Sequence, residues 1–285
     1  MGNLHHMTSW ASSVRMTRRR WLQSGVAALA VGGTWNASRR VDSGADRGTT
    51  LEGPPVAPPS GKAFRVGTFN IHGCKGQDGC RDVDRVAGYL KSCDLIGLQE
   101  VHGGLFYETG SQAGQLGQRI DCPWLFAPSV RRWHSFDFGN AMLSRLPVIS
   151  WQRIPLPRIT GNTHHNLLLV QLEHHGRPFQ TIIAHLHRKD EAERVRHLRE
   201  ALFLFNSLSG PALLIGDLNS RRSDPQLKRL LGDGKVQDAL AGAYLGHEAT
   251  NIDWILMRGF HAVDAGFEVN QASDHPFLWA DLEIV

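Results

Sequence analysis

Four buried, apolar stretches of the sequence end in a side chain of a type found in catalytic and metal sites. They are FRVGTFN, DLIGLQE, FQTIIAHLH and PALLIGDLN, and their polar ends include Asn70, Glu100, His185 and Asp217. A strand that ends in this way places its last side chain at the rim of a sheet. One polar strand end is ordinary, but four at one rim would build a polar, anionic pocket on a rigid frame. The sequence therefore predicts a functional pocket where these strands end.

The elements that must position these residues are short apolar runs with a few helical stretches between them. Helices are expected at 82–92, with Asp82 as N-cap, and at 190–208, where Asp190 and Glu193 suggest a capping box. The regions 102–122 and 129–137 read as loops. Strands are expected at 64–70, 94–100, 139–144, 148–154, 166–173, 179–187, 211–219, 252–257, 261–269 and 276–284.

Composition permits a phosphate substrate without selecting DNA. The chain has 285 residues, of which 41% are hydrophobic and 20% charged, so a sizeable core is expected and wholesale disorder is not. The net charge is +4, and much of the excess lies in the first forty residues. The four cysteines form no CxxC pair, which disfavours a zinc or thioredoxin-type site. Cys74 and Cys80 bracket a Gly-rich loop, and either a small disulfide or free thiols fit there.

The first 62 residues have the composition of a targeting signal followed by a linker. TRRRWLQ (17–23) and the short apolar run after it resemble a twin-arginine export signal, and the run is too short to anchor the chain stably in a membrane. We expect a signal peptide at 1–35, a Pro/Gly/Ser-rich linker at 36–62 and a catalytic domain at 63–285, exported to the periplasm or secreted. A basic disordered tail or a nucleic-acid-binding arm is the alternative for the N-terminus, and the start is Met1 or Met16.

Seven short motifs occur in an order that resembles the endonuclease/exonuclease/phosphatase superfamily, the DNase I-like fold. They are TFNIHG (68–73), GLQEVH (97–102), GNAMLSR (139–145), AHLH (184–187), GDLN (216–219), IDWIL (252–256) and SDHPF (273–277). The resemblance implies an α+β fold, a four-layer α/β/β/α sandwich of two mixed β-sheets flanked by helices. It also implies a metal-dependent hydrolase of phosphoric esters. The chemistry requires a cation against the anionic phosphate, a base to prepare water, and a donor for the leaving oxygen.

The resemblance assigns the cation and phosphate ligands. Glu100 resembles the principal metal ligand, with Asn70 and Asp274 beside it, and oxygen donors of this kind suit Mg²⁺ or Mn²⁺. Asn70 and Asn140 resemble amides that lie near the phosphate. Arg131 lies in the polar segment RRWHSFDFG, a mixture that would grip a phosphate and stack on a base, or simply form a surface loop.

The resemblance also assigns the catalytic groups. Asp217 resembles the group that orients or deprotonates the attacking water, and Asn219 resembles its neighbour that donates to the phosphate. His275 resembles the histidine that touches the scissile phosphate, with Asp253 fixing its tautomer and raising its pKa. His185 resembles a histidine that protonates the leaving group or stabilises the transition state.

The sequence departs from the family pattern at two places. The segment HLHR (185–188) replaces the HLD of many small members, and the phosphate-contacting tyrosine of repair-type members has no counterpart, which argues against a repair endonuclease.

The substrate is expected to be a phosphodiester or phosphomonoester, either extracellular nucleic acid or a small ester. The alternatives are a phospholipid or sphingomyelin-type phosphodiesterase and a catalytically silent binding module. A Ser273 hydrolase is disfavoured because no G-x-S-x-G elbow exists. The oligomeric state stays open.

Overall fold

The computed structural model describes residues 39–40, 47–104, 107–132, 136–157, 164–243 and 251–285. The chain divides into two units, Met1–Arg39 and Arg40–Val285, and the sheets and helices that position the site belong to the second. The expected signal peptide at 1–35 lies outside the described residues, as does Trp133, the aromatic residue of the segment RRWHSFDFG. Among the described residues, no helix combines the length and apolar character needed to cross a membrane.

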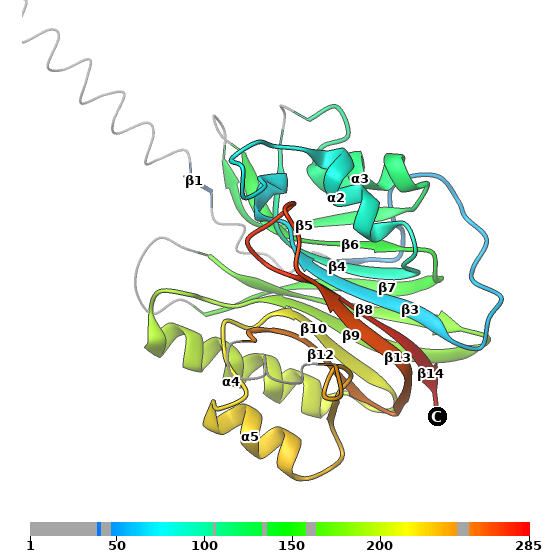
Figure 1. Ribbon diagram of the computed structural model, residues 1–285, viewed down its shortest axis with the longest axis vertical. Helices are drawn as coiled ribbons and strands as arrows, with labels where there is room; N and C mark the ends of the chain where they lie inside the picture. Colours follow the sequence, from blue (N-terminus) through cyan, green and yellow to red (C-terminus); the bar gives the residue numbers. More distant parts are fainter. Residues whose placement is uncertain (1–38, 41–46, 105–106, 133–135, 158–163, 244–250) are drawn as a thin grey trace, which may run out of the picture. The chain divides into compact units, whose positions relative to one another are not determined.

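The second unit is a sandwich of two mixed β-sheets with helices on both outer faces (Figure 1). One sheet contains the run β5-β6-β4-β3-β14-β13 and the other is ordered β11-β12-β10-β9-β8-β7-β2. Helices α2 (Val83–Leu90) and α3 (Gln112–Ile120) cover the first sheet, and α4 (Glu191–Ser207) and α5 (Pro225–Gly232) cover the second. The strands are β1 (Arg39–Arg40), β2 (Arg47–Gly48), β3 (Phe64–Asn70), β4 (Leu95–Gly103), β5 (Trp124–Arg132), β6 (Asp137–Ser144), β7 (Val148–Pro155), β8 (Asn166–His174), β9 (Arg177–His185), β10 (Ala212–Asp217), β11 (Gln237–Asp238), β12 (Asp253–Arg258), β13 (Phe260–Glu268) and β14 (Phe277–Ile284). A short 3-10 turn, η1 (His72–Cys74), follows β3. The expected four-layer α/β/β/α sandwich is confirmed.

Three apolar layers hold the sandwich together. The middle layer fills the space between the sheets with side chains such as Met142, Leu168 and Ile215. A second layer lies under α2 and α3, and a third lies under α4 and α5. Both sheets are therefore buried on two faces, which explains why their central strands read as continuous apolar runs rather than alternating ones.

Local signals in the sequence explain most of the helix starts. The Asp82 side chain accepts from the backbone N–H of Arg85, and the Asp190 side chain accepts from that of Glu193. His187 joins this helix start, because the Asp190 backbone N–H donates to His187 Nδ1 and the Glu193 carboxylate lies 3.2 Å from His187 Nε2.

Three parts of the expected organisation differ from the structure. The region expected to be a loop at 102–122 contains α3, and the loop expected at 129–137 is partly strand β5. Within the stretch expected to be a linker, β2 pairs with β7, and Glu52 pairs with Trp124. The Trp124 indole N–H also donates to the Glu52 carboxylate, a contact that composition alone does not indicate.

The four cysteines are free thiols in the structure. Cys74 is buried while Cys80 is exposed, so the small disulfide is not formed. Burial raises the pKa of Cys74 to about 12, which keeps this thiol protonated and unreactive.

Candidate functional site

One row of residues across the second sheet carries three of the expected catalytic side chains. Asp217 ends β10 and is paired with His185 on the parallel neighbour β9. On the other side it is paired with Asp253 on the antiparallel strand β12. The register alone therefore brings two carboxylates and an imidazole to the same level of the sheet, and all three residues are buried.

The first sheet supplies Asn70 and Glu100 through a β-bulge. Asn70 ends β3 and is paired with Gln99 on the parallel strand β4. The pairing of β4 with β6 shifts register between Leu98 and Val101, so Gln99 and Glu100 together face a single residue, Asn140. Glu100 has φ 56, a left-handed conformation that a non-glycine residue adopts only when its surroundings impose it. A bulge of this kind redirects a side chain.

The two sheets meet at the amide of Asn70. Its Nδ2 lies 3.2 Å from Glu100 Oε1 and 3.1 Å from Asp217 Oδ2. The same atom lies 3.4 Å from His275 Nε2. Two carboxylates and an imidazole from three separate segments therefore lie around one amide group. The predicted residues Asn70, Glu100, Asp217 and His275 form one cluster.

His275 is held by Asp253. Their Nδ1 and Oδ2 atoms are 2.9 Å apart, which is hydrogen-bond distance, and Asp253 is almost completely buried. The backbone before His275 is fixed as well, because the Ser273 hydroxyl donates to the carbonyl of Asn70 at 2.6 Å. Ser273 thus acts in the frame of the site and has no nucleophilic geometry.

Burial and neighbouring charges shift the pKa values of Asp217 and His275. Burial, followed by repulsion from Asp253, raises the pKa of Asp217 well above that of an ordinary carboxyl. Burial alone would lower the pKa of His275, but the hydrogen bond to Asp253 and the nearby carboxylates outweigh it and raise the pKa to about 9. A carboxyl with a raised pKa is a stronger proton acceptor than an ordinary one, and a pKa of about 9 leaves His275 cationic at neutral pH.

His185 faces the same cluster in its neutral form. Its Nε2 lies 3.7 Å from Asp217 Oδ2 and 3.9 Å from Glu100 Oε1. Burial, aided by the charge of His275, lowers the pKa of His185 to about 3. A neutral imidazole can donate a hydrogen bond but holds no spare proton to release, so the lowered pKa agrees better with stabilisation of the transition state than with protonation of the leaving group.

The donor set fits a divalent cation. Glu100 and Asp217 share the amide of Asn70, and Asp253 lies beside Asp217. Among the described residues no lysine or arginine forms an ion pair with any of the three. Asp217, Asp253 and His275 also offer three ligand atoms within 4.8 Å of one another. In this second group His275 Nδ1 and Asp253 Oδ2 are already joined by a hydrogen bond. Glu100 is more accessible, with 26% of its side chain exposed, and is the better candidate to hold a hard cation.

Four of the expected residues lie outside the central cluster or have engaged side chains. Asp274 is half exposed and lies 3.5 Å from His72 Nδ1, so its part in holding a metal stays a prediction. The Asn219 amide donates to the carbonyl of Leu186, and its own backbone N–H donates to Asp217 Oδ1. The expected roles of Asn219, Asn140 and Arg131 also stay predictions. Asn140 Nδ2 donates to the backbone and side-chain oxygens of Asn166, and the side chain of Arg131 lies outside the described part of the chain.

A cluster of buried histidines behind His185 was missed by sequence reasoning. The rings of His165, His187 and His197 have centroids 5.3–6.3 Å apart. His165 Nδ1 lies 2.8 Å from the carbonyl of His185 and so supports the backbone of that residue. Its other nitrogen, Nε2, is buried and has no hydrogen-bond partner among the described residues. No local motif surrounds His165, so only the pairing of β8 with β9 reveals this position.

The histidine cluster predicts acid sensitivity. Burial, followed by repulsion from His185 and His197, lowers the pKa of His165 well below its ordinary value. The unfolded chain then binds a proton that the folded chain does not, so the contribution of this group to stability is complete above about pH 6.5 and is lost as the pH falls below that. His165→Asn can keep the hydrogen bond to the His185 carbonyl. Between pH 7.5 and 5.5 we expect this variant to lose less free energy of unfolding than the parent by about 1 kcal/mol.

Chemical denaturation at the two pH values measures this difference. The matched control is His261→Asn, because His261 is exposed on β13. Equal losses in the parent and the His165→Asn variant would contradict the interpretation.

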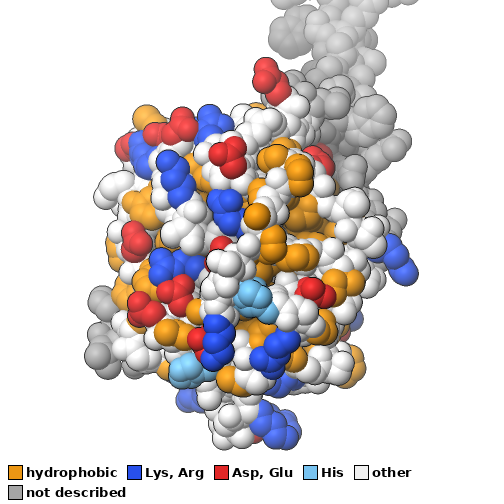
Figure 2. All heavy atoms as spheres, turned by 90° about the vertical axis from the view of Figure 1, so that its right-hand side faces the viewer, with side chains coloured by type: hydrophobic (Ala, Val, Ile, Leu, Met, Phe, Trp, Pro, Cys, Tyr) orange, Lys and Arg blue, Asp and Glu red, His pale blue; other side chains and the backbone are white. Residues whose placement is uncertain are grey.

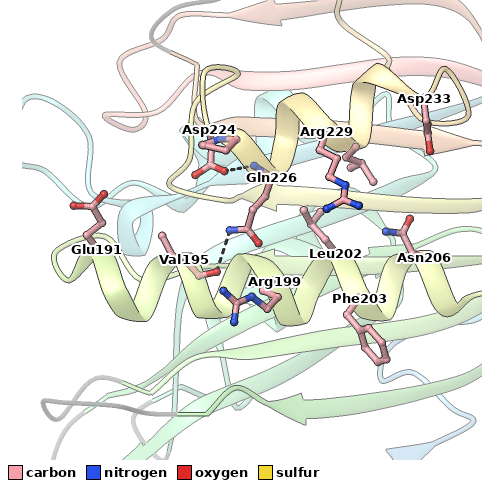
Figure 3. A pocket seen from close by; sticks show the side chains of 12 residues that line it. Glu191, Val195, Arg199, Leu202, Phe203, Asn206, Asp224, Gln226, Arg229 and Asp233 are labelled. Carbon is pink, nitrogen blue, oxygen red and sulfur yellow. Dashed lines mark hydrogen bonds between the residues drawn. The ribbon is translucent and has the colours of Figure 1, made fainter.

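The hollow between α4 and α5 is separate from the cluster. It encloses about 740 Å³, and its lining includes Val195, Arg199, Phe203 and Arg229 but none of the clustered residues (Figure 3). On the face shown in Figure 2, acidic and basic side chains are interspersed, with apolar side chains between them. That face therefore carries no broad patch of a single charge, in agreement with the modest net charge.

Comparisons with known proteins agree with this geometry. The profile of the Endonuclease/Exonuclease/phosphatase family matches residues 67–275. None of the curated proteins matches the sequence. An endonuclease/exonuclease/phosphatase from Beutenbergia cavernae has a similar structure, with a TM-score of 0.65 and 20% identity over 78% of this chain and 72% of that chain.

Two further solved structures share the fold. The human Nocturnin catalytic domain with bound sulfate anion has a TM-score of 0.60 and 17% identity, covering 85% of this chain and 98% of that chain. Sphingomyelinase C from Streptomyces griseocarneus has a TM-score of 0.55 and 16% identity, covering 77% of this chain and 99% of that chain. Since the family profile spans most of the second unit and the solved structures confirm its fold, the chain belongs to the endonuclease/exonuclease/phosphatase family.

Proposed function

We propose that the chain is an exported, divalent-metal-dependent phosphoesterase that hydrolyses phosphodiester bonds. Members of its family are hydrolases that act on phosphoesters. The observation that carries the proposal is the convergence of Glu100, Asp217 and His275 on the amide of Asn70. This arrangement places three groups close together: an anionic ligand for a cation, a base and a protonated donor.

Each residue of the cluster has a chemical task in this proposal. Mg²⁺ or Mn²⁺ held by Glu100, with Asn70 and Asp274, would neutralise charge on the phosphate. Asp217 takes a proton from the attacking water, whose oxygen forms the new bond to phosphorus as the ester bond breaks. His275 donates to a phosphate oxygen and is kept cationic by Asp253. The neutral His185 donates a hydrogen bond to the leaving oxygen, which takes its proton from solvent water as it departs as an alcohol.

Several observations support a catalytic rather than a silent module. A module that only binds would have no reason to keep two buried carboxylates beside a cationic histidine, because each buried charge costs free energy. The related Nocturnin domain was solved with a bound sulfate, an anion with the tetrahedral shape of phosphate. Sphingomyelinase C has the same fold, so the fold alone does not choose between nucleotide and lipid esters.

Hydrolysis of bis(p-nitrophenyl) phosphate by the full chain tests the proposal. We expect turnover with Mg²⁺ or Mn²⁺, its loss on addition of a chelator, and its return when the metal is resupplied. A panel of plasmid DNA, RNA, sphingomyelin and inositol phosphates then identifies the ester class. Chelator-resistant turnover would contradict the metal requirement, and inactivity towards every ester would contradict the function.

Export rests on the N-terminal sequence TRRRWLQ followed by an apolar run. Fractionation of bacterial cells that carry a twin-arginine pathway and produce the full chain should place the mature protein outside the cytoplasm, without roughly its first thirty residues. Replacing both Arg18 and Arg19 with lysine should leave it inside, while the same change at Arg39 and Arg40 is the matched control. An uncleaved cytosolic parent chain would count against export.

A further inference from the structure

A row of aromatic rings leads away from His185 along the paired ends of β4 and β6. The Phe138 ring centroid lies 6.2 Å from that of His185, and His102 follows at 6.0 Å from Phe138. Phe136 then stacks on His102, with centroids 5.5 Å apart and planes 10° from parallel. Tyr107 meets Phe136 edge-on at 5.6 Å. We call His102, Tyr107, Phe136 and Phe138 the aromatic row.

The aromatic row runs from the buried cluster to the surface. His185, at its inner end, is 8% exposed, whereas Phe136, at its outer end, is 40% exposed. His102 and Phe138 face each other in the register of β4 and β6, directly after the bulge that redirects Glu100. A substrate whose phosphate lies against Glu100 and His185 would therefore extend its next group along these rings.

Ring geometry, rather than charge, indicates the kind of group that fits the aromatic row. Its outer end carries charges of both signs, because Asp137 follows Phe136, the exposed Glu108 follows Tyr107, and Arg81 lies within electrostatic range of Tyr107. His102 and Phe136 are stacked face to face, and the exposed end of this stack suits a flat, polarisable partner. Base–aromatic stacking is tolerant of base identity.

We propose that the aromatic row is a subsite for the nucleobase of a nucleotide substrate, next to the phosphate position. This inference rests on the proposed function and narrows its substrate class. The rings of Phe136 and Phe138 provide the stacking surface, while His102 holds Phe136 in place by stacking on it.

Binding of mononucleotides to the full chain tests the subsite without requiring turnover. Titration calorimetry in Ca²⁺ compares adenosine 5′-monophosphate and adenosine 3′-monophosphate with ribose 5-phosphate, which lacks the base. We expect at least one nucleotide to bind about tenfold more tightly than ribose 5-phosphate, the scale of one base–aromatic stack. Equal affinities, or no measurable binding of either nucleotide, would overturn the proposal.

Substitutions at Phe136 separate stacking from simple apolar contact. Phe136→Ala and Phe136→Leu should each remove the tenfold preference, because neither side chain has a ring, and Phe136→Trp should keep it. Phe203→Ala is the matched control, since Phe203 is 72% exposed and lines the separate hollow between α4 and α5. A preference that survives in Phe136→Leu would overturn stacking.

A lipid outcome is distinguished in the same assay. Short-chain lysophosphatidate that binds more tightly than glycerol phosphate, and does so through Phe136, would assign the row to an acyl chain and overturn the nucleobase proposal. A base preference in a protein that hydrolyses no phosphoester would instead retain the subsite and refute the proposed function.

Discussion

Glu100→Gln is expected to lower the kcat for bis(p-nitrophenyl) phosphate by about a thousandfold, with an unchanged melting temperature. Glutamine has the same shape but only one oxygen acceptor and no charge, so the proposed metal site loses its main anionic ligand. The hydrogen bond from Asn70 Nδ2 to Glu100 Oε1 can persist through the amide oxygen, which preserves the local structure. Steady-state rates across a Mg²⁺ titration measure the loss.

The backbone of Glu100 makes the same position a test of function against stability. Its φ of 56 costs a non-glycine residue about 1–2 kcal/mol, and glycine adopts this conformation freely. Glu100→Gly should therefore lose activity as fully as the glutamine variant while unfolding at the same or a higher temperature. Glu268→Gln, an exposed change on β13, is the control. Near-normal turnover in Glu100→Gln would show that Glu100 is not a metal ligand of the catalytic site.

The sequence predicted the strands that carry the site because their burial on both faces leaves long apolar runs. The expected strand at 64–70 agrees with β3 at both ends, and the expected helix at 190–208 encloses α4. Polar residues that end such runs were therefore a usable guide to the cluster, and the register placed Asp217 between His185 and Asp253. Strand ends are informative here because Asn70, His185 and Asp217 are each the last residue of a strand.

The missed elements have weak local signals that tertiary packing overrides. Helix α3 contains Gly114 and Gly117, which have low helix propensity, yet a Cβ at Gly117 would meet the Trp124 ring at 2.4 Å, so the close approach requires glycine. Strand β5 contains Pro128, which disfavours a strand and coincides with a register shift. Helix α5 was recognisable in principle, since Asp224 caps it and Pro225 occupies its first turn.

Other parts of the site depend on contacts between distant segments. The bulge that redirects Glu100 and the packing of His165 behind His185 both require neighbouring strands in register, which no local pattern encodes. The same applies to Asn140, whose amide bonds to Asn166 across the gap between the sheets. Motif resemblance therefore located the residue types, and the structure decided which of them meet.

His275→Gln is expected to lower kcat by about a hundredfold to a thousandfold, the loss expected when one donor to the developing charge is removed, with folding retained. Asp253→Asn should cost nearly as much, because Asp253 acts through the imidazole that it holds at 2.9 Å. If the two residues form one unit, the double variant will lose little more than the worse single variant, whereas independent roles would multiply the losses. Rates of the four proteins on one substrate complete this cycle.

The pH profile of Asp253→Asn separates a charge effect from a purely structural one. In the parent, the hydrogen bond and charge of Asp253 outweigh burial and raise the pKa of His275 to about 9, so the cationic form persists through neutral pH and is lost above it. Without that carboxylate, burial dominates and the pKa of His275 falls, so the basic limb of the activity profile should move to lower pH. A variant that only loosens the site would lower the rate at every pH and leave the limb in place. Asp264→Asn, an exposed change on β13, controls for loss of one negative charge. An unmoved basic limb would mean that Asp253 orients His275 without keeping it charged.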